Sequence, residues 1–414
     1  IFKMNFIIKM ICSYKYKIRM LNAMIILLIG FAGCNTEAQS PQSSSAVEAK
    51  DALSTFQVAD GFKIELIASE PLVSDPVDME IDEYGRLYVV EMHGYPLDKT
   101  GSGNIILLSD KDGDGNMDKR TVFAEGLTLP TSVMRWKKGI MVTDAPNLLY
   151  FEDTDGDGVA NKKDTLLTGF ALSNPQHNVN SPIYGLDNWI YVAHEGSVST
   201  REYKEEFGDE GADIVFPGRA NSPRLPKNAN GRSIRFRPDK QELEMTSSHT
   251  QFGHTFDEWG HLFECNNSNQ GYHEVISNRY FDRNPDLLSS EATQNMSDHL
   301  NAPEVFPTTT HPDRQILTNV GVMTAACGLT AYLGGAFPAP YDKNVTFITE
   351  SVSNLVHVDA LKDSGASFTA SRILKNKEFL SSTDAWSRPV NLYVGPDGAL
   401  YVVDYYRKVI ESPE

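Results

Sequence analysis

Six short segments of the chain share one order of polar and apolar positions. Each starts with turn-forming residues such as Asp, Asn, Lys or Gly, continues into a β-rich apolar run, and often ends in Asp, Glu or Asn. The segments are DEYGRLYVVE from Asp82, WKKGIMVTD from Trp136, LDNWIYVAH from Leu186, FDEWGHLFECNN from Phe256, YDKNVTFITE from Tyr341 and GPDGALYVVD from Gly395. Because Asp, Asn and Gly favour tight turns while Val, Ile, Tyr and Phe suit a pleated surface, each segment predicts a turn followed by a β-strand.

The spacing of the six segments predicts how their strands are arranged. The segments start between 50 and 85 residues apart, which is too long for one hairpin and suits one four-stranded sheet each. One such segment would be unremarkable in any all-β protein, but six in order indicate a repeat. We therefore predict an all-β fold, a six-bladed β-propeller over residues 55–414, with loop insertions after the third and fourth segments. Strands near Phe56 are expected to join the last blade and close the ring.

The N-terminal residues follow a different pattern, which is typical of export signals. Basic residues precede an apolar run over residues 21–32, and Gly33 and Cys34 follow it. The run is short for a membrane span. It resembles a bacterial lipoprotein signal, with residues 31–33 as the lipobox and Cys34 as the lipidated first residue. An ordinary secretory signal with a chance cysteine is the alternative.

The expected organisation has three parts. Residues 1–34 are the lipoprotein signal peptide and lie outside the fold, residues 35–54 are a flexible tether rich in Ser, Gln and Ala, and residues 55–414 are the propeller. The protein is then exported and lipid-anchored to a bacterial membrane, on its periplasmic or cell-surface side.

The net charge and the cysteines limit which binding partners, disulfides and haem groups we expect. The net charge of −18 argues against binding to nucleic acid or to an anionic membrane surface, so the membrane is reached through the lipid anchor only. Apart from Cys12 and Cys34, the chain has Cys265 and Cys327, which are compatible with a disulfide or with two buried thiols. No CxxCH motif is present, so we expect no haem attached to this chain.

Two acidic loops, DKDGDGNMD from Asp110 and DTDGDGVANKKD from Asp153, carry the strongest chemical signal. Carboxylates at alternate positions, with Gly at the sharp turn, suit a calcium ion that takes six to eight oxygen ligands. The predicted ligands are Asp110, Asp112, Asp114, Asn116 through its carbonyl, and Asp118 in the first loop, and Asp153, Asp155, Asp157, Val159 through its carbonyl, Asn161 and Asp164 in the second. Strand-like segments flank both loops, which favours a structural role at blade edges. Solvated Asp-Gly turns without metal are the alternative.

Several segments carry a family resemblance that covers nearly all of residues 56–414. They include GRLYVVEMHGYP, NPQHNVNSPIYGLDNWIYVAHEG, QFGHTFDEWGHLFECNNSN, ACGLTAYLGG and WSRPVNLYVGPDGALYVVDYYRKVIESPE. With these, the chain resembles the N-terminal propeller of the membrane-bound dehydrogenases abundant in Planctomycetes, Verrucomicrobia and Bacteroidetes, distant relatives of soluble quinoprotein glucose and sorbosone dehydrogenases. Members of that family often continue into helical repeats and a c-type cytochrome domain, so we expect this chain to be truncated at its C-terminus.

The resemblance implies an oxidoreductase that uses pyrroloquinoline quinone to oxidise a sugar or another alcohol. It places the general base just before the third-blade strand, at His177 in NPQHNVN. A cytochrome c domain or protein is the implied electron acceptor. Independently, a histidine in a polar loop suits base catalysis, because imidazole exchanges protons near neutral pH. A loop histidine that caps neighbouring backbone is the alternative.

One segment departs from the family pattern. Glucose dehydrogenases hold the quinone oxygens with an Arg-Asn pair shortly before the fourth-blade strand, where this chain has SHTQFGH over residues 248–254. The candidate cofactor-binding residues are therefore His254, Arg232, Arg388 and Arg407, since Arg holds planar oxygen pairs well. Arg is also common in salt bridges between blades. Tyr95, Trp189, Trp259 and Tyr405 are candidates for stacking on a sugar ring, or for packing.

Two further functions stay open at the level of sequence, because propellers serve many functions. The first is a non-catalytic propeller that binds glycan or exported protein partners. The second is a calcium-dependent lactonase or hydrolase, which would need calcium in the central channel.

Overall fold

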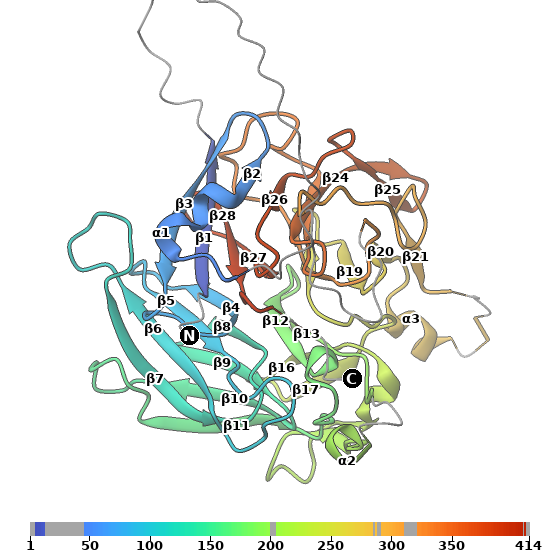
Figure 1. The fold of residues 1–414 in the computed structure, drawn as a ribbon. Coiled ribbons are helices and arrows are strands. Elements are labelled where there is room, and N and C mark those ends of the chain that lie inside the picture. Colours follow the sequence, from blue (N-terminus) through green and yellow to red (C-terminus); the bar gives the residue numbers. More distant parts are fainter. Residues whose placement is uncertain are drawn as a thin grey trace, which may run out of the picture.

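The computed structural model describes residues 5–12, 45–198, 204–284, 286–287, 291–309, 321–408 and 410. Its strands form six antiparallel sheets around a central axis (Figure 1), so the predicted six-bladed β-propeller is confirmed. The first strands of successive blades contact one another, which places them innermost.

The blades follow one another in chain order, and each has four main strands. Blade 1 contains β4 (Pro76–Ile81), β5 (Leu87–Glu91), β6 (Gly103–Ser109) and β7 (Lys119–Leu127). Blade 2 contains β8 (Ser132–Trp136), β9 (Gly139–Asp144), β10 (Asn147–Glu152) and β11 (Lys162–Thr168). Blade 3 contains β12 (Asn180–Tyr184), β13 (Ile190–Ala193), β16 (Ile234–Arg237) and β17 (Glu242–Met245).

The last three blades complete the ring. Blade 4 contains β18 (His254–Phe256), β19 (Leu262–Asn266), β20 (Asn269–Glu274) and β21 (Thr293–Asn295). Blade 5 contains β22 (Ala326–Ala331), β23 (Val345–Glu350), β24 (Leu355–Ser364), β25 (Ser367–Arg372), β26 (Leu380–Ser382) and β2 (Phe56–Val58). Blade 6 contains β27 (Pro389–Val394), β28 (Leu400–Asp404), β1 (Phe6–Cys12) and β3 (Phe62–Ser69).

Each repeated segment supplies the turn between the first two strands of a blade and then the second strand itself. The predicted insertions are also present. After the third segment come α2 (Lys204–Phe207), β14 (Asp213–Val215) and β15 (Arg224–Lys227), followed by η4 (Asn228–Gly231). Strands β14 and β15 pair onto the outer edge of blade 2. After the fourth segment comes α3 (Asn278–Arg283).

The N-terminal residues differ from the expectation that residues 1–34 lie outside the fold. Strand β1 pairs with β28 on one side and with β3 on the other, so it fills the third position of blade 6. The side chains of Phe6, Ile7 and Ile8 are buried. An apolar strand in this position satisfies two sheet edges that would otherwise be unpaired. The predicted lipobox and Cys34 lie outside the described residues.

The last part of the expected tether is also ordered against the ring. The short helices α1 (Ala49–Ala52) and η2 (Leu53–Thr55) lead into β2, and Ala52 is buried. The backbone N–H of Val47 donates to the hydroxyl of Tyr406 at 2.6 Å. Among the described residues, no helix is long and apolar enough to cross a membrane.

A girdle of hydrogen bonds links the innermost strands, or the residue next to them, from each blade to the next. Each bond uses a polar side chain of one blade and a polar group of its neighbour. The pairs are Val133 N to Asp78 Oδ2 (3.0 Å), Ser181 N to Ser132 Oγ (2.9 Å), Gly253 N to Asn180 Oδ1 (3.0 Å), Ala331 N to Thr255 Oγ1 (3.1 Å), Thr330 Oγ1 to Leu392 O (3.4 Å) and Asn391 Nδ2 to Asp78 Oδ1 (2.8 Å). The girdle satisfies polar groups that burial would otherwise penalise.

The acidic residues that end several repeated segments also have a structural role. Glu350, at the end of β23, accepts the backbone N–H groups of Thr324 and Ala325 at 3.0 and 2.8 Å. Asp144, at the end of β9, accepts those of Thr128 and Leu129 in the same way. Each carboxylate fixes the loop that leads into its own blade, which explains the recurrence of an acid at this position.

Candidate active site

The strand directions divide the ring into two faces. We call one face the loop rim, because it carries the loops that lead into the first strands and those that join second to third strands. The turn rim, on the opposite face, carries the turns between first and second strands, and the connections from third to fourth strands leave the blades on that side. His177 lies on the loop rim, whereas the acidic loops follow the third strands of blades 1 and 2 and lie away from it. This placement agrees with a structural role for the acidic loops.

His177 is held in place by the turn that precedes blade 3. It ends the short helix η3 (Pro175–His177), where the Asn174 side chain accepts the N–H of Gln176 at 3.1 Å. The Nδ1 atom of His177 contacts the carboxylate of Glu195, which follows β13. Both side chains are mostly buried, and no described residue bonds to Nε2 of His177. A histidine oriented through Nδ1 by a carboxylate, with Nε2 unused, is an arrangement suited to general base catalysis.

Residues of blades 1 and 6 approach the His177 turn. The Gln176 side chain donates from Nε2 to the carbonyl of Ile410 at 3.0 Å and also contacts the hydroxyl of Tyr95. Tyr95 packs edge-on against Tyr405, with ring centroids 5.7 Å apart. The candidate site therefore combines the loops of three blades, which the sequence could not place together. Tyr95 is the one predicted stacking residue that lies here with a partly exposed ring.

A second histidine paired with carboxylates lies in the same region and was not predicted. His93 donates from Nδ1 to Asp75 at 3.2 Å and from Nε2 to Glu91 at 3.1 Å. These two carboxylates raise the pKa of His93 to about 9. Asp75 also accepts from Arg407, whose Nε and Nη2 atoms lie 3.0 and 2.9 Å from Oδ1. Arg407, a predicted cofactor ligand, is thus paired with a carboxylate of its own chain.

Two other predicted cofactor residues have their polar groups directed into the fold. Arg388 is 1% exposed, and its guanidinium donates to the carbonyls of Ser351, Val352, Arg407 and Lys408 at 2.8 to 3.2 Å. His254 is also buried, and its Nε2 lies 2.7 Å from the carbonyl of Ser181. Burial lowers the pKa of His254 to about 4, which keeps the ring neutral.

The fourth predicted cofactor residue, Arg232, donates from Nη1 to Asn278 of α3 at 2.8 Å. Pyrroloquinoline quinone carries several carboxylates, so a pocket for it needs cations with free donors. The described contacts instead assign Arg388 to backbone carbonyls and Arg407 to Asp75, and leave His254 neutral. As a set, the predicted residues do not fit this cofactor, and we assign no reaction step to it.

The first acidic loop gathers three of its predicted ligands. Carboxylate oxygens of Asp110, Asp112 and Asp118 lie within 4.8 Å of one another. The backbone N–H groups of Gly115 and Gly113 donate to Asp110 and lower the pKa of its carboxyl. Asp114 lies outside the cluster and accepts from the backbone and side chain of Asn116.

The second acidic loop has the same core. Carboxylate oxygens of Asp153, Asp155 and Asp157 lie within 4.8 Å of one another, while Asp164 lies outside this group on β11. The oxygen of Asn161 accepts from the backbone and hydroxyl of Thr154. Three close carboxylates in each loop fit a hard cation such as calcium, and they repel one another without it. The Val159 backbone N–H donates to Asp157, and no contact of its carbonyl is described.

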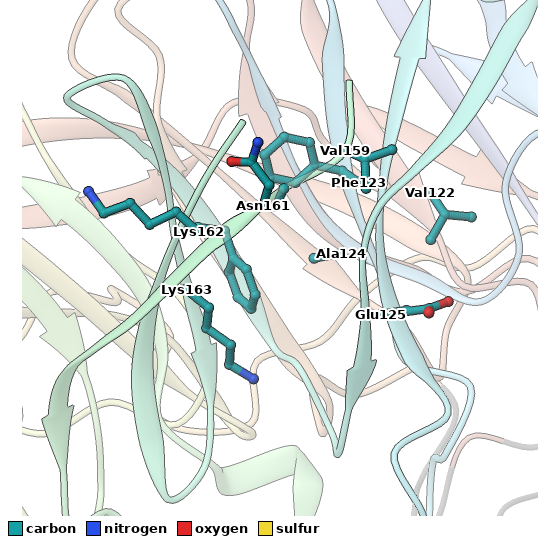
Figure 2. A pocket seen from close by; sticks show the side chains of 10 residues that line it. Val122, Phe123, Ala124, Glu125, Val159, Asn161, Lys162 and Lys163 are labelled. Atoms are coloured by element: carbon teal, nitrogen blue, oxygen red, sulfur yellow. The ribbon is translucent and has the colours of Figure 1, made fainter. Parts of the chain in front are cut away.

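A cleft of about 400 Å³ adjoins the second acidic loop, between β7 and the start of β11. Figure 2 shows Lys162 and Lys163 on one side of the cleft and Val122 and Glu125 on the other. It lies away from the loop rim and shares no residue with the His177 site.

The two internal cysteines are free thiols. Cys265 is buried, and its sulfur contacts the carbonyls of Phe252 and Gly253. Cys327 contacts the Thr349 hydroxyl at 3.2 Å. Of the two arrangements compatible with the sequence, the structure has the thiol form.

Comparison with known proteins gives one family and a set of distant structural likenesses. Residues 48–414 match a family described as "Domain of unknown function (DUF7133)". The comparison with curated proteins gave no match.

Three solved structures illustrate the distant likenesses. The soluble aldose sugar dehydrogenase of Escherichia coli is 14% identical, with a TM-score of 0.43, 81% of this chain covered and 94% of that one. The pyranose dehydrogenase PQQ domain of Coprinopsis cinerea is 12% identical, with a TM-score of 0.41 and coverages of 84% and 97%. A calcium structure of a Trichoderma reesei enzyme of family AA12 is 12% identical, with a TM-score of 0.46 and coverages of 84% and 96%. At such low identities and TM-scores, the activities of these proteins say nothing about the activity of this chain.

Proposed function

The chain belongs to the DUF7133 family, and we propose that it is an exported, calcium-binding oxidoreductase that oxidises an alcohol group of a sugar or another alcohol. One observation carries the proposal: the contact between His177 Nδ1 and the Glu195 carboxylate on the loop rim. The sequence segments that resemble membrane-bound dehydrogenases support it, because they place the general base at His177.

In the proposed reaction, His177 removes the proton of the substrate hydroxyl through Nε2. Glu195 accepts the Nδ1–H, which fixes the tautomer and stabilises the imidazolium that forms. Loss of the proton allows the carbon to release a hydride, and the alcohol becomes a carbonyl. The hydride carries two electrons to an oxidant. The family resemblance implies a quinone and then a cytochrome c domain or protein, but the described arginines do not form its pocket.

Calcium has a structural part in this proposal. The clusters at Asp110 and Asp153 lie at the outer strands of blades 1 and 2, away from His177. A bound ion would stabilise the folded connection between third and fourth strands. Calcium chemistry in the central channel, as a lactonase would need, is not favoured by this placement.

Export and lipid anchoring through Cys34 belong to the same proposal and rest on sequence alone. The lipobox pattern and the acidic propeller agree with a location outside the cytoplasm, on the surface of a bacterial membrane.

A second candidate function is a non-catalytic propeller that binds glycan or exported proteins. The structural use of Arg388 favours it, since the residue donates to four backbone carbonyls and is buried. In this case the loop rim would bind a ligand without oxidising it.

A test for bound quinone and dye reduction separates the two functions. Purified protein in calcium, with and without added pyrroloquinoline quinone, is examined for a bound chromophore and for dye reduction with aldoses and polyols. The oxidoreductase predicts reduction that His177→Ala lowers by about 10²-fold or more. His299→Ala is the control, because His299 is a half-exposed histidine beside Asp298 on another loop of the same rim. Absence of both chromophore and reduction would favour the binding module.

A further inference from the structure

Two turns on the turn rim, in blades 1 and 4, have the same sequence pattern and the same hydrogen bonds. They are DEYGR from Asp82 and DEWGH from Asp257. Asp82 accepts the N–H groups of the second and fourth residues after it at 2.9 Å each, and so does Asp257. In both turns the second carboxylate oxygen of the Asp also forms a 2.7 Å hydrogen bond with the side chain of the last turn residue. That residue is Arg86 in blade 1 and His261 in blade 4. The turns are therefore fixed in the same conformation.

Each of these turns presents an aromatic ring to solvent from its third position. Tyr84 is 76% exposed and Trp259 is 75% exposed. In contrast, the strands that follow these turns carry Tyr88 and Phe263, and both of these aromatic side chains are buried. The Arg86 guanidinium lies over the Tyr84 ring, 5.3 Å from its centroid, yet most of each ring is in water. Rigid turns that hold two large aromatic side chains so exposed suggest a ligand.

The two rings lie on opposite sides of the ring axis, because blades 1 and 4 are three positions apart in a ring of six. Leu186, in the corresponding turn of blade 3, is 70% exposed and lies beside Gly260, where an added Cβ would be 3.3 Å from its side chain. On the other side, a groove of about 560 Å³ is formed by Glu83, Leu333 and Tyr393 among others, from the turns of blades 5, 6 and 1. The rings thus flank an extended surface across the turn rim.

Charge limits the ligands that this surface can accept. The six turns between first and second strands (82–86, 137–138, 185–189, 257–261, 332–344 and 395–399) carry seven carboxylates against four Lys or Arg side chains. The whole chain has a net charge of −18. An anionic polymer would be repelled. The exposed rings are also separated by charged residues, unlike the continuous apolar centre of a stable protein interface.

We propose that the turn rim binds a neutral polysaccharide, with sugar rings stacked on Tyr84 and Trp259. The apolar face of a pyranose ring matches an exposed aromatic face, while neighbouring carboxylates such as Glu258 accept hydrogen bonds from sugar hydroxyls. Rings on opposite sides of the axis suit an extended polymer better than a single sugar. This surface lies on the face opposite His177, so the proposal does not depend on the oxidation of any substrate.

Affinity electrophoresis tests the proposal directly. The full chain is run in native gels that contain laminarin, xyloglucan, galactomannan or dextran, and in gels without polymer. We expect at least one of these neutral polysaccharides to retard the protein, Trp259→Ala or Tyr84→Ala to weaken retardation at least tenfold in apparent Kd, and the double variant to abolish it. Tyr280→Ala is the matched control, because Tyr280 is 59% exposed on α3, outside the six turns.

Three results would overturn the proposal. They are a wild-type chain that none of the four polymers retards, a double variant retarded like wild type, and equal retardation by dextran sulfate. A second copy of the chain is the alternative ligand, and equilibrium sedimentation without polymer tests for it. If the wild-type chain is a dimer and the double variant is a monomer, the two rings serve self-association instead. Thermal melting confirms that the variants are folded, as expected for side chains that project into water.

Discussion

Asn391 of blade 6 donates a 2.8 Å hydrogen bond from Nδ2 to Oδ1 of Asp78 in blade 1. The two residues are 313 positions apart in the chain, and their bond is the one that closes the girdle around the axis. Asp78 also accepts the N–H of Val133 from blade 2 at 3.0 Å. One half-buried carboxylate therefore connects three blades, and its removal from water raises its pKa to about 7.

Replacement of Asp78 by Ala should lower the free energy of unfolding by about 2 to 4 kcal/mol. The change leaves the Asn391 amide and the Val133 N–H without partners in a buried position. Urea unfolding near neutral pH measures the effect. Asp60→Ala is the control, because the Asp60 side chain is fully exposed and its removal should change stability by less than about 0.5 kcal/mol. Equal losses of unfolding free energy in the two variants would show that the contacts of Asp78 with the neighbouring blades do not stabilise the ring.

His93 should stabilise the fold at low pH and lose that effect at high pH. Asp75 and Glu91 raise its pKa to about 9, above the ordinary value of 6.5, so its contribution is complete below pH 6.5 and is lost as pH rises through 9. His93→Asn should be less stable than wild type by about 1 to 2 kcal/mol at pH 6, after allowance for partial solvent screening. Unfolding curves of both proteins at pH 6 and pH 10 test this. A difference in unfolding free energy between wild type and variant that grows with pH would contradict it.

Glu195→Gln should lower kcat far more than it changes KM, if the chain has the proposed oxidoreductase activity. The amide can still contact Nδ1 of His177 but cannot stabilise the imidazolium, so we expect a loss of about 10- to 10²-fold in kcat. The measurement is steady-state dye reduction with the best substrate found. Glu205→Gln, the same change at an exposed carboxylate on α2 in the same long insertion, should leave kcat unchanged. A kcat equal to wild type in Glu195→Gln would remove Glu195 from the mechanism.

Removal of calcium should lower the melting temperature. Three carboxylates gather in each acidic loop, at Asp110 and at Asp153, and a cation bound only in the folded state adds about 2.7 kcal/mol per site at a hundredfold excess over its Kd. Differential scanning fluorimetry with excess calcium or EGTA measures this shift. The double variant Asp112→Asn/Asp155→Asn should lose most of the response to calcium. An unchanged melting temperature in EGTA would contradict calcium binding.

Strand β1 leads to a prediction about the unprocessed chain. Ile8 is fully buried between β28 and β3, so Ile8→Ala should cost about 2 to 4 kcal/mol in a chain produced without export. Lys9→Ala, on the same strand with surface ion pairs, should cost less than about 1 kcal/mol. Cleavage before Cys34 would remove β1 altogether, so the intact mass of exported protein shows which arrangement exists. An exported protein that keeps residues 6–12 would exclude lipidation at Cys34.

The site was only partly predictable from the sequence. His177 was predicted from the family resemblance, and the two acidic loops were predicted because the spacing of their carboxylates is a local pattern. Glu195, Asp75 and His93 were missed, since nothing in their local sequence distinguishes a residue that meets a partner from another loop. The predicted arginines show the converse. Arg388 matches a cofactor ligand in type, but its partners are backbone carbonyls that only the folded chain brings around it.

The sequence by itself determined the repeated unit, because turn chemistry and strand propensity are local properties and each copy, such as residues 82–91, encodes its own turn and second strand. It also determined which loops gather carboxylates. Only the tertiary structure decided which residues from distant segments meet. It paired Asn391 with Asp78 and Glu195 with His177, inserted β1 into the last blade, and left Tyr84 and Trp259 in water. These outcomes depend on closure of the ring, which brings together groups that are far apart in the chain and whose contacts no local pattern encodes.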